Sequence, residues 1–236
     1  MRARGSATAA PCRPHLRCGW QGTRLRVTPR CGLKVKVCGI TNLEDALAGF
    51  FAGADALGFV FYKKSPRYIC PDKAANISGI LPKKIKRVGV FVDEKVSTVK
   101  KIAKLCGLDM LQFHGQESVQ YCEKFKGYKV IKAFRISGKK DIEGISKYKT
   151  FAYLFDSFSK DRFGGTGNKF NWKILQQAAT IKPVVFLSGG LTAGNVGKAV
   201  ALLKPDWVDV SSSLELNPGK KDYKKMRKFI QRVRSA

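Results

Sequence analysis

The chain has few acidic residues for its 236-residue length: 17 Asp and Glu stand against 45 Lys and Arg, with only two His. The formal net charge is therefore +28. An excess of this size points to anionic partners, whether nucleic acid, a membrane surface or a small phosphorylated substrate. Long apolar runs are also absent. No stretch of about 18 apolar residues could form a transmembrane helix, and the N-terminus lacks the apolar region of a secretory signal.

CxxC pairs are missing as well, although the chain has seven cysteines. An odd number of cysteines without paired spacing argues against a disulfide scaffold and against a structural zinc site. We therefore expect no bound metal and mostly reduced thiols in a reducing compartment. Hydrophobic residues make up 44% of the chain, which is enough for a sizeable core and excludes global disorder.

Residues 1–33 differ in composition from the rest of the chain. They contain seven Arg but no Lys and no acid, whereas the remainder has 31 Lys and seven Arg. They show no helical or strand period, so we predict a poorly ordered basic extension at 1–33 ahead of one domain at 34–236. An organellar transit peptide is the second interpretation, although Ser6 is the only serine there. Foreign sequence ahead of the true start would also explain the change in composition. A nucleic-acid-binding arm is a further alternative, but this segment lacks the interleaved aromatic residues on which bases stack.

The rest of the chain alternates short apolar runs with stretches of helical length. Runs typical of buried parallel strands occur at Val35–Cys38, Ala56–Phe61, Arg87–Val92, Met110–Phe113, Lys129–Phe134, Phe151–Phe155, Val184–Leu187 and Trp207–Val210. Helical periods occur at Leu43–Ala52, Val96–Leu105, Asn195–Leu203 and Tyr223–Val233, and the second of these predicts one apolar face that includes Leu105. Eight similar strand–helix units predict an α/β fold, a single (β/α)8 TIM barrel. A doubly wound sheet is the alternative.

Reactive side chains of such a barrel belong at the carboxyl ends of its strands. Cys38 ends the first run, and we interpret it as a reactive thiol, although a free cysteine is more often a small buried hydrophobe. Asp156 follows an apolar run, where an acid is either at the barrel mouth or expensively buried. His114 ends the fourth run and is either a general base or a hydrogen-bonded histidine that lines the pocket.

The loops after the strands predict anion binding. Arg67 lies between Pro66 and Tyr68 and suits a carboxylate or phosphate, although charged loop residues are by default solvated. The loops after the seventh and eighth runs contain Gly189, Gly190 and Ser211–Ser213. Barrels commonly build a phosphate site from backbone N–H groups at these two places. The Gly-rich run 163–167 could close over a ligand, but it is not a dinucleotide motif.

Ordered motifs along residues 33–236 resemble those of phosphoribosylanthranilate isomerase. The motifs that carry the resemblance are Lys36–Asn42, Gly53–Phe61, Ser65–Ile69, Val88–Val92, Gln112–Gly115, Phe155–Asp156, Gly164–Gly167, Phe170–Trp172, Leu187–Leu191, Val208–Ser212 and Pro218–Lys221. The resemblance implies an Amadori rearrangement of N-(5-phosphoribosyl)anthranilate to 1-(2-carboxyphenylamino)-1-deoxyribulose 5-phosphate, a step of tryptophan biosynthesis that needs no cofactor. In the family the position of Ser213, or one nearby, usually holds glycine.

Residue roles follow from the same resemblance. It makes Asp156 the general acid that opens the ribose ring and Cys38 the general base that takes the C2 proton. Substrate binding falls to Arg67, Gln112, His114 and Asp209, with Arg67 on the anthranilate carboxylate. Phosphate binding falls to Gly189, Gly190, Ser211, Ser212 and Ser213.

Two other classes of function compete with this interpretation. A related phosphate-binding barrel, such as indole-glycerol-phosphate synthase or a sugar-phosphate epimerase, is the second enzyme hypothesis. A nucleic-acid binder that has lost catalysis is the third, but the lysines are dispersed over most helices and loops. We therefore expect a small anionic substrate, no nucleic acid, no membrane, and a monomer or homodimer. We expect it in the cytoplasm, or in a plastid if residues 1–33 are a transit peptide.

Overall fold

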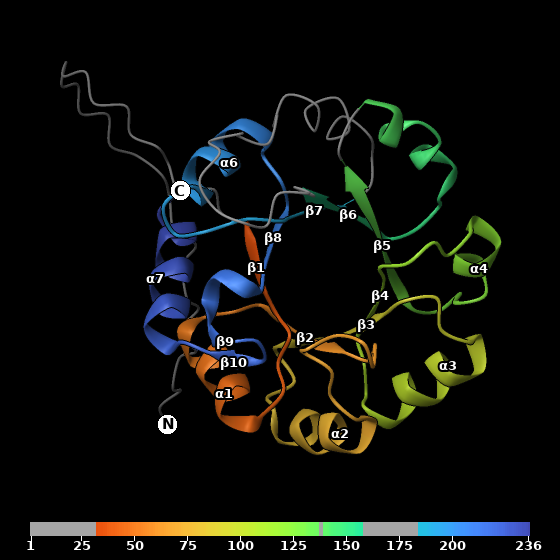
Figure 1. Cartoon of the computed structure of the whole chain (residues 1–236), viewed down its shortest axis with the longest axis horizontal. Helices are drawn as coiled ribbons and strands as arrows, with labels where there is room; N and C mark the ends of the chain where they lie inside the picture. Colours follow the sequence, from red (N-terminus) through yellow and green to blue (C-terminus); the bar gives the residue numbers. More distant parts are fainter. Residues whose placement is uncertain (1–31, 137–138, 158–183) are drawn as a thin grey trace, which may run out of the picture.

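Eight parallel strands close into one barrel in the computed structural model, which describes residues 32–136, 139–157 and 184–236. The strands are β1 (Lys34–Cys38), β2 (Ala56–Val60), β3 (Lys86–Phe91), β4 (Met110–Phe113), β5 (Lys129–Ile136), β6 (Ala152–Ser157), β7 (Val184–Ser188) and β8 (Trp207–Val210). Each strand pairs with the next, and β1 pairs with β8 to close the ring (Figure 1). The predicted (β/α)8 barrel is confirmed, and each predicted run lies within two residues of its strand.

Helices surround the barrel on its outside (Figure 1). They are α1 (Leu43–Ala52), α2 (Pro71–Ile80), α3 (Val96–Leu105), α4 (Val119–Glu123), α6 (Val196–Leu203) and α7 (Tyr223–Arg234), with short 3₁₀ helices η1 (Lys139–Ile142), η2 (Ile145–Lys147) and η3 (Ser212–Leu214). Local sequence explains their ends: the Asn42 side chain accepts from the backbone N–H of Asp45 at the start of α1, and Gly53 ends it in the left-handed conformation. The apolar face predicted for α3 is wrong at Leu105, which is 48% exposed. At 3.6 residues per turn it lies about 120° round the helix from the buried Val99, whereas Cys106, the next residue, is buried on the same side as Val99.

Apolar side chains fill the barrel and also the layer between strands and helices. The inner set includes Met110, Leu154 and a stacked pair, Phe186 and Trp207, whose ring centroids are 4.8 Å apart. The outer set is larger and joins the strands to every flanking helix from α1 to α7 among those described. Side chains alternate between the two sets along strands such as β6, where Leu154 belongs to the inner set and Tyr153 and Phe155 to the outer set, as period-2 geometry requires.

Three aspartates tie neighbouring strands together at the amino ends of the strands. Asp55 Oδ2 accepts from Val35 N at 2.7 Å, and Asp109 and Asp206 accept in the same way from Arg87 and Val185 at 2.8 and 2.9 Å. Two residues before each aspartate the backbone is left-handed, at Gly53 (φ 96°), Gly107 (φ 57°) and Lys204 (φ 47°). Lys204 therefore occupies a conformation that glycine adopts at the other two places.

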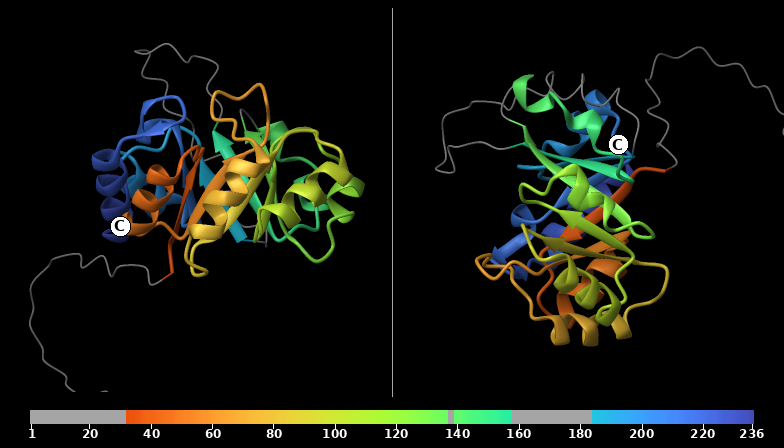
Figure 2. Two further views of the ribbon diagram at one scale, coloured as in Figure 1. Left: turned by 90° about the horizontal axis from the view of Figure 1, so that it is seen from below. Right: turned by 90° about the vertical axis from the view of Figure 1, so that its right-hand side faces the viewer.

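A short hairpin between β8 and α7 is an addition to the barrel that we did not predict. Its strands are β9 (Glu215–Asn217) and β10 (Lys220–Lys221). The hairpin lies beside α1 (Figure 1), and the backbone N–H of Lys221 donates to Asp45 Oδ2 at 2.9 Å. The loop after β2 and the loop after β8 project from the same end of the barrel (Figure 2, left).

Some expectations concern residues that the structure covers only in part. The predicted extension 1–33 lies outside the described residues except for Gly32 and Leu33, and the Gly-rich run 163–167 lies outside them entirely. Within residues 32–136, 139–157 and 184–236, no helix combines the length and the apolar character that a membrane span needs. The four cysteines described there, Cys38, Cys70, Cys106 and Cys122, are all free thiols.

Candidate active site

Cys38 lies at the carboxyl end of β1, above a buried ion pair. Lys36 precedes it by two residues on the same strand, so both side chains point into the barrel. Lys36 Nζ lies 2.8 Å from Asp209 Oδ1 on β8, and the Lys36 side chain is fully buried. Gly58 on β2 leaves room for this arrangement: an added Cβ would lie 2.7 Å from Cys38 Sγ and 3.1 Å from Lys36 Nζ. The predicted reactive thiol is therefore surrounded by charge rather than by apolar side chains alone.

Opposing effects set the proton affinity of Cys38. Burial raises the pKa of the thiol above its ordinary value, and the carboxylate of Asp209 adds to the rise. The ammonium groups of Lys36 and Lys221 lower it, but only in part. Burial likewise disfavours the charged form of Lys36, yet Asp209 and Cys38 outweigh it, so the pKa of Lys36 is raised. Lys36 therefore stays cationic beneath the thiol.

Asp156, near the carboxyl end of β6, is joined to two polar residues from β4 and the loop after it. His114 Nε2 lies 3.3 Å from Asp156 Oδ2, and Gln112 Nε2 lies 3.0 Å from His114 Nδ1. If the Gln112 amide donates to Nδ1, the ring proton is on Nε2 and is donated to Asp156. Gln112 Oε1 is buried and has no hydrogen-bond partner in the described part of the chain. His114 thus contacts the predicted acid directly, and Gln112 lies behind it, 1% exposed.

Arg67 reaches across to the hairpin. Its Nε and Nη2 donate to Glu215 Oε1 and Oε2 at 2.8 and 2.6 Å, a two-pronged ion pair. Its aliphatic stem lies on Gly39, where an added Cβ would approach Arg67 Cδ to 2.7 Å. Burial would raise the pKa of Glu215, but hydrogen bonds from Arg67 and Lys221 outweigh it and hold that pKa below its usual value. The arginine is held, not freely solvated.

The two predicted phosphate loops are linked through Ser213. Its Oγ donates to the carbonyl of Leu191, in the loop after β7, at 2.5 Å. Gly189 and Gly190 both have positive φ, 88° and 59°, whereas Ser213 does not, so a side chain is tolerated there. Ser211 Oγ donates to the carbonyl of Cys38 at 3.0 Å and ties the eighth loop to the end of β1. Ser212 lies between them and is exposed.

Three charged residues of this region were missed from the sequence: Lys36, Glu215 and Lys221. A signal for Lys36 existed, because a lysine between Val35 and Val37 in a buried strand must pair with an acid. Glu215 and Lys221 follow the last barrel strand, where spacing alone gives no partner. Asp209, predicted to bind substrate, is paired with Lys36 and 5% exposed, with Ser188 Oγ 3.4 Å from its other oxygen.

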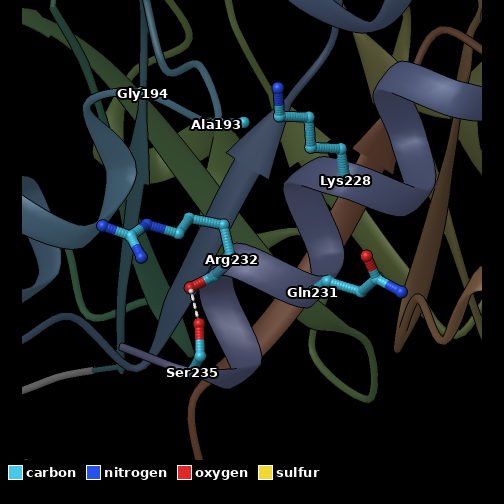
Figure 3. A pocket seen from close by; sticks show the side chains of 6 residues that line it. All are labelled: Ala193, Gly194, Lys228, Gln231, Arg232 and Ser235. Atoms are coloured by element: carbon cyan, nitrogen blue, oxygen red, sulfur yellow. Dashed lines mark hydrogen bonds between the residues drawn. The ribbon is translucent and has the colours of Figure 1, made fainter.

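A separate hollow of about 590 Å³ lies on the outer surface between α7 and the turn before α6 (Figure 3). Its lining residues are Ala193, Gly194, Lys228, Gln231, Arg232 and Ser235. Lys228 extends toward Ala193 (Figure 3), and Arg232 lies against α6, where an added Cβ at Gly197 would be 3.7 Å from its Nε. The hollow contains none of the predicted site residues. Within the described residues no group of His, Cys, Asp and Glu side chains is arranged to hold a metal ion.

Comparison with known proteins shows the family to which the chain belongs. Residues 35–232 match the family described as N-(5'-phosphoribosyl)anthranilate (PRA) isomerase. The protein of that name from Geobacter sp. strain M21 is 49% identical over 197 residues, 84% of this chain and 96% of the relative. The crystal structure of the Thermotoga maritima enzyme is 41% identical, with a TM-score of 0.81 over 86% of this chain and all of that one. A complex with reduced 1-(o-carboxyphenylamino)-1-deoxyribulose 5-phosphate is 40% identical, with a TM-score of 0.79 and the same coverage.

Proposed function

The chain belongs to the N-(5'-phosphoribosyl)anthranilate isomerase family and is an enzyme of tryptophan biosynthesis, and from this premise we propose which of its residues carry out the reaction. The reaction converts N-(5-phosphoribosyl)anthranilate to 1-(2-carboxyphenylamino)-1-deoxyribulose 5-phosphate. It needs one group to protonate the ribose ring oxygen and another to take the proton from C2. The observation that carries the assignment is that Asp156 and Cys38 lie at the carboxyl ends of different strands, β6 and β1, of one closed barrel.

Asp156 is the general acid of this proposal. As the carboxylic acid it gives its proton to the ring oxygen, the C1–O bond breaks, and the substrate becomes an open-chain Schiff base. Its contact with His114 Nε2 at 3.3 Å supports the role, since the imidazole holds the carboxyl group in place at the end of β6. A 180° rotation of the Gln112 amide would exchange Nε2 and Oε1, so that Oε1 could accept from Nδ1–H of His114. This orientation would give Oε1 the partner that it otherwise lacks. We therefore place Gln112 and His114 behind Asp156 as positioning residues.

Cys38 is the general base. Its thiolate takes the C2 proton of the Schiff base and forms the enolamine. The enolamine becomes the ketone of the product when its C2 hydroxyl loses a proton and C1 gains one. The raised pKa of the buried thiol means that the uncharged form dominates near neutral pH in the unliganded enzyme. Lys36 and Lys221 stabilise the thiolate once it forms, because both ammonium groups lower that pKa. We expect kcat/KM to rise with pH accordingly.

Anion binding divides between two sides of the barrel mouth. Arg67 holds the anthranilate carboxylate through the N–H groups that Glu215 leaves open. The phosphate lies at the loops of Gly189–Gly190 and Ser211–Ser213, where backbone N–H groups and the small residues allow close approach. Asp209 belongs to the substrate-binding residues of this proposal. Its carboxylate contacts Lys36 and Ser188, and both of these residues lie on strands of the barrel.

The test combines complementation with kinetics. A tryptophan auxotroph that lacks this step should grow with the wild-type chain but not with Cys38→Ser or Asp156→Asn. For the purified proteins we expect kcat to fall about 10²–10⁴-fold, with little change in KM or melting temperature. Cys70→Ser, at an exposed thiol outside the site, is the matched control and should retain full activity. Near-normal turnover of Cys38→Ser would refute its assignment as the base.

Assembly and compartment remain predictions within this proposal. We propose a monomer or a homodimer that acts on a small anionic substrate in the cytoplasm. A plastid is the alternative if residues 1–33 are a transit peptide. The sequence placed the domain boundary after residue 33, but Leu33 is only 6% exposed and packs in the core. We therefore propose that the folded domain begins at Leu33.

A further inference from the structure

Glu215 lies between two cations, Arg67 and Lys221, at the barrel mouth. Arg67 donates to both of its carboxylate oxygens, and Lys221 Nζ lies 2.9 Å from Oε1. The side chain of Glu215 is 5% exposed and that of Lys221 is fully buried, whereas that of Arg67 is 20% exposed. One carboxylate between two cations leaves a net charge of +1, so the group as a whole still attracts an anion.

The geometry of the pair leaves part of the guanidinium open. A guanidinium carries five N–H groups in a rigid plane. Glu215 accepts from the edge formed by Nε and Nη2. The second edge is formed by Nη1 and the other N–H of Nη2, and its geometry suits a second carboxylate. We propose that Glu215, clamped by Lys221, is a positioning residue that orients Arg67 so that this second edge receives the anthranilate carboxylate. The proposal rests on the role proposed above for Arg67.

The hairpin gives Glu215 a fixed place from which to do this. A register shift between Lys220 and Lys221 turns Lys221 toward Glu215, and the N–H of Gly219 donates to Glu215 Oε1 at 3.3 Å. An added Cβ at Gly219 would lie 3.2 Å from the carbonyl oxygen of Pro66, the residue before Arg67. The hairpin turn therefore packs directly against the loop that presents the arginine.

The same hairpin also contacts the end of β1. Thr41 Oγ1 donates to the carbonyl of Gly219 at 2.5 Å, and Lys221 Nζ lies 3.3 Å from the carbonyl of Ser211, whose hydroxyl donates to the carbonyl of Cys38. One buried carboxylate thus connects the arginine with the loops beside the thiol. A purely structural ion pair would hold the fold but would not distinguish one ligand from another.

The test compares two ligands that differ only in the carboxylate. The first is reduced 1-(o-carboxyphenylamino)-1-deoxyribulose 5-phosphate, and the second is the same compound without the carboxyl group. Calorimetry gives the Kd of both for wild type, Arg67→Lys, Glu215→Gln and Glu215→Asp. We expect each variant to bind the carboxylate ligand about 10-fold more weakly or worse and the other ligand within about twofold of wild type. Glu215→Asp keeps the charge, so it remains informative if Glu215→Gln does not fold.

A double-mutant cycle separates positioning from general stabilisation. In an Arg67→Ala background, Glu215→Gln should weaken the carboxylate ligand by no more than about twofold, because its effect passes through the arginine. Glu44→Gln is the matched control: it breaks the 2.9 Å pair between Glu44 and Lys220, on the exposed side of the same hairpin, and should leave both Kd values unchanged.

The possible failures are distinguishable. If Arg67→Lys weakens only the carboxylate ligand but the Glu215 variants weaken both ligands equally, or neither, the positioning role is refuted and the role of Arg67 stands. If Arg67→Lys changes the Kd of both ligands by the same factor, Arg67 does not hold the carboxylate. The binding role of Arg67 and the positioning role of Glu215 are then both refuted. The reaction assigned to Asp156 and Cys38 is unaffected by either result.

Discussion

Lys36 and Asp209 form an ion pair 2.8 Å long inside the barrel, and the thiol of Cys38 lies against it. The two side chains come from positions 173 residues apart in the sequence, but their Cα atoms are direct partners across β1 and β8. The two charges act on the thiol in opposite directions, because the ammonium lowers the pKa of Cys38 and the carboxylate raises it. Neutralising one or the other partner of this pair should therefore shift the pKa of Cys38 in opposite directions.

Lys36→Met should raise the pKa of Cys38 further, and Asp209→Asn should lower it. Thiolate formation is followed by ultraviolet absorbance against pH in the unliganded protein. Each variant is compared with the same variant carrying Cys38→Ser, so that the other thiols cancel. A shift of both variants in the same direction would contradict the opposing roles of the two charges. Lys36→Met also leaves Asp209 buried without its partner, so we expect a lower melting temperature.

The pH dependence of stability offers a second prediction, at Glu215. Its pKa in the folded protein lies below the usual value of 4.5, so its stabilising contribution is complete above about pH 4.5 and is lost as the pH falls through the lowered folded-state pKa. Glu215→Gln should lower the unfolding free energy by about 3 kcal/mol at pH 6, because it breaks a buried ion pair.

The difference between wild type and Glu215→Gln should then shrink as the pH is lowered toward 3, since the wild-type carboxylate becomes protonated. Denaturant unfolding of both proteins at pH 6 and at several lower pH values measures this difference in unfolding free energy. Glu44→Gln, at an exposed pair, should show little difference at any pH. A difference between wild type and Glu215→Gln that stays constant with pH would show that packing, not charge, accounts for the effect of the substitution.

The strands were predictable from the sequence because buried parallel strands are continuous apolar runs, and eight of them at even spacing leave few topologies. The hairpin was not, since strands of three and two residues carry no period. Side chains at strand ends, such as Cys38 and Asp156, could be placed because the barrel itself fixes where strands end. Their charged neighbours could not, because Lys36 meets Asp209, and Arg67 meets Glu215, only through closure of the ring and docking of the hairpin.

Lys204 should be replaceable by glycine with a gain in stability. Its backbone φ of 47° is left-handed, and glycine occupies the matching positions before Asp55 and Asp109. Lys204→Gly removes the steric cost of a side chain in that region, so we expect a gain of about 1 kcal/mol, or roughly 2–4 °C in melting temperature. Lys198→Gly, within α6, is the control and should destabilise by about 1 kcal/mol. Equal effects of the two substitutions would contradict the conformational argument.

Truncations of the N-terminus should show that residues 1–31 are dispensable for stability and that Leu33 is not. Leu33 is 6% exposed, and its carbonyl accepts from Arg234 Nη1 at 2.6 Å, so it belongs to the packed barrel. Arg234 also lies 2.8 Å from Asp55 Oδ2, which in turn accepts from the N–H of Val35 at the start of β1.

A chain that begins at Gly32 should therefore keep its melting temperature and its kcat, since it loses no described contact. A chain that begins at Lys34 loses a buried leucine and should be less stable by about 1.5–3 kcal/mol. Removing the seven arginines of the extension can raise KM modestly, because long-range attraction of an anionic substrate weakens. That increase should vanish near 1 M salt, where the Debye length is about 3 Å. Unfolding of the chain that begins at Gly32 would instead show that residues 1–31 are part of the folded domain.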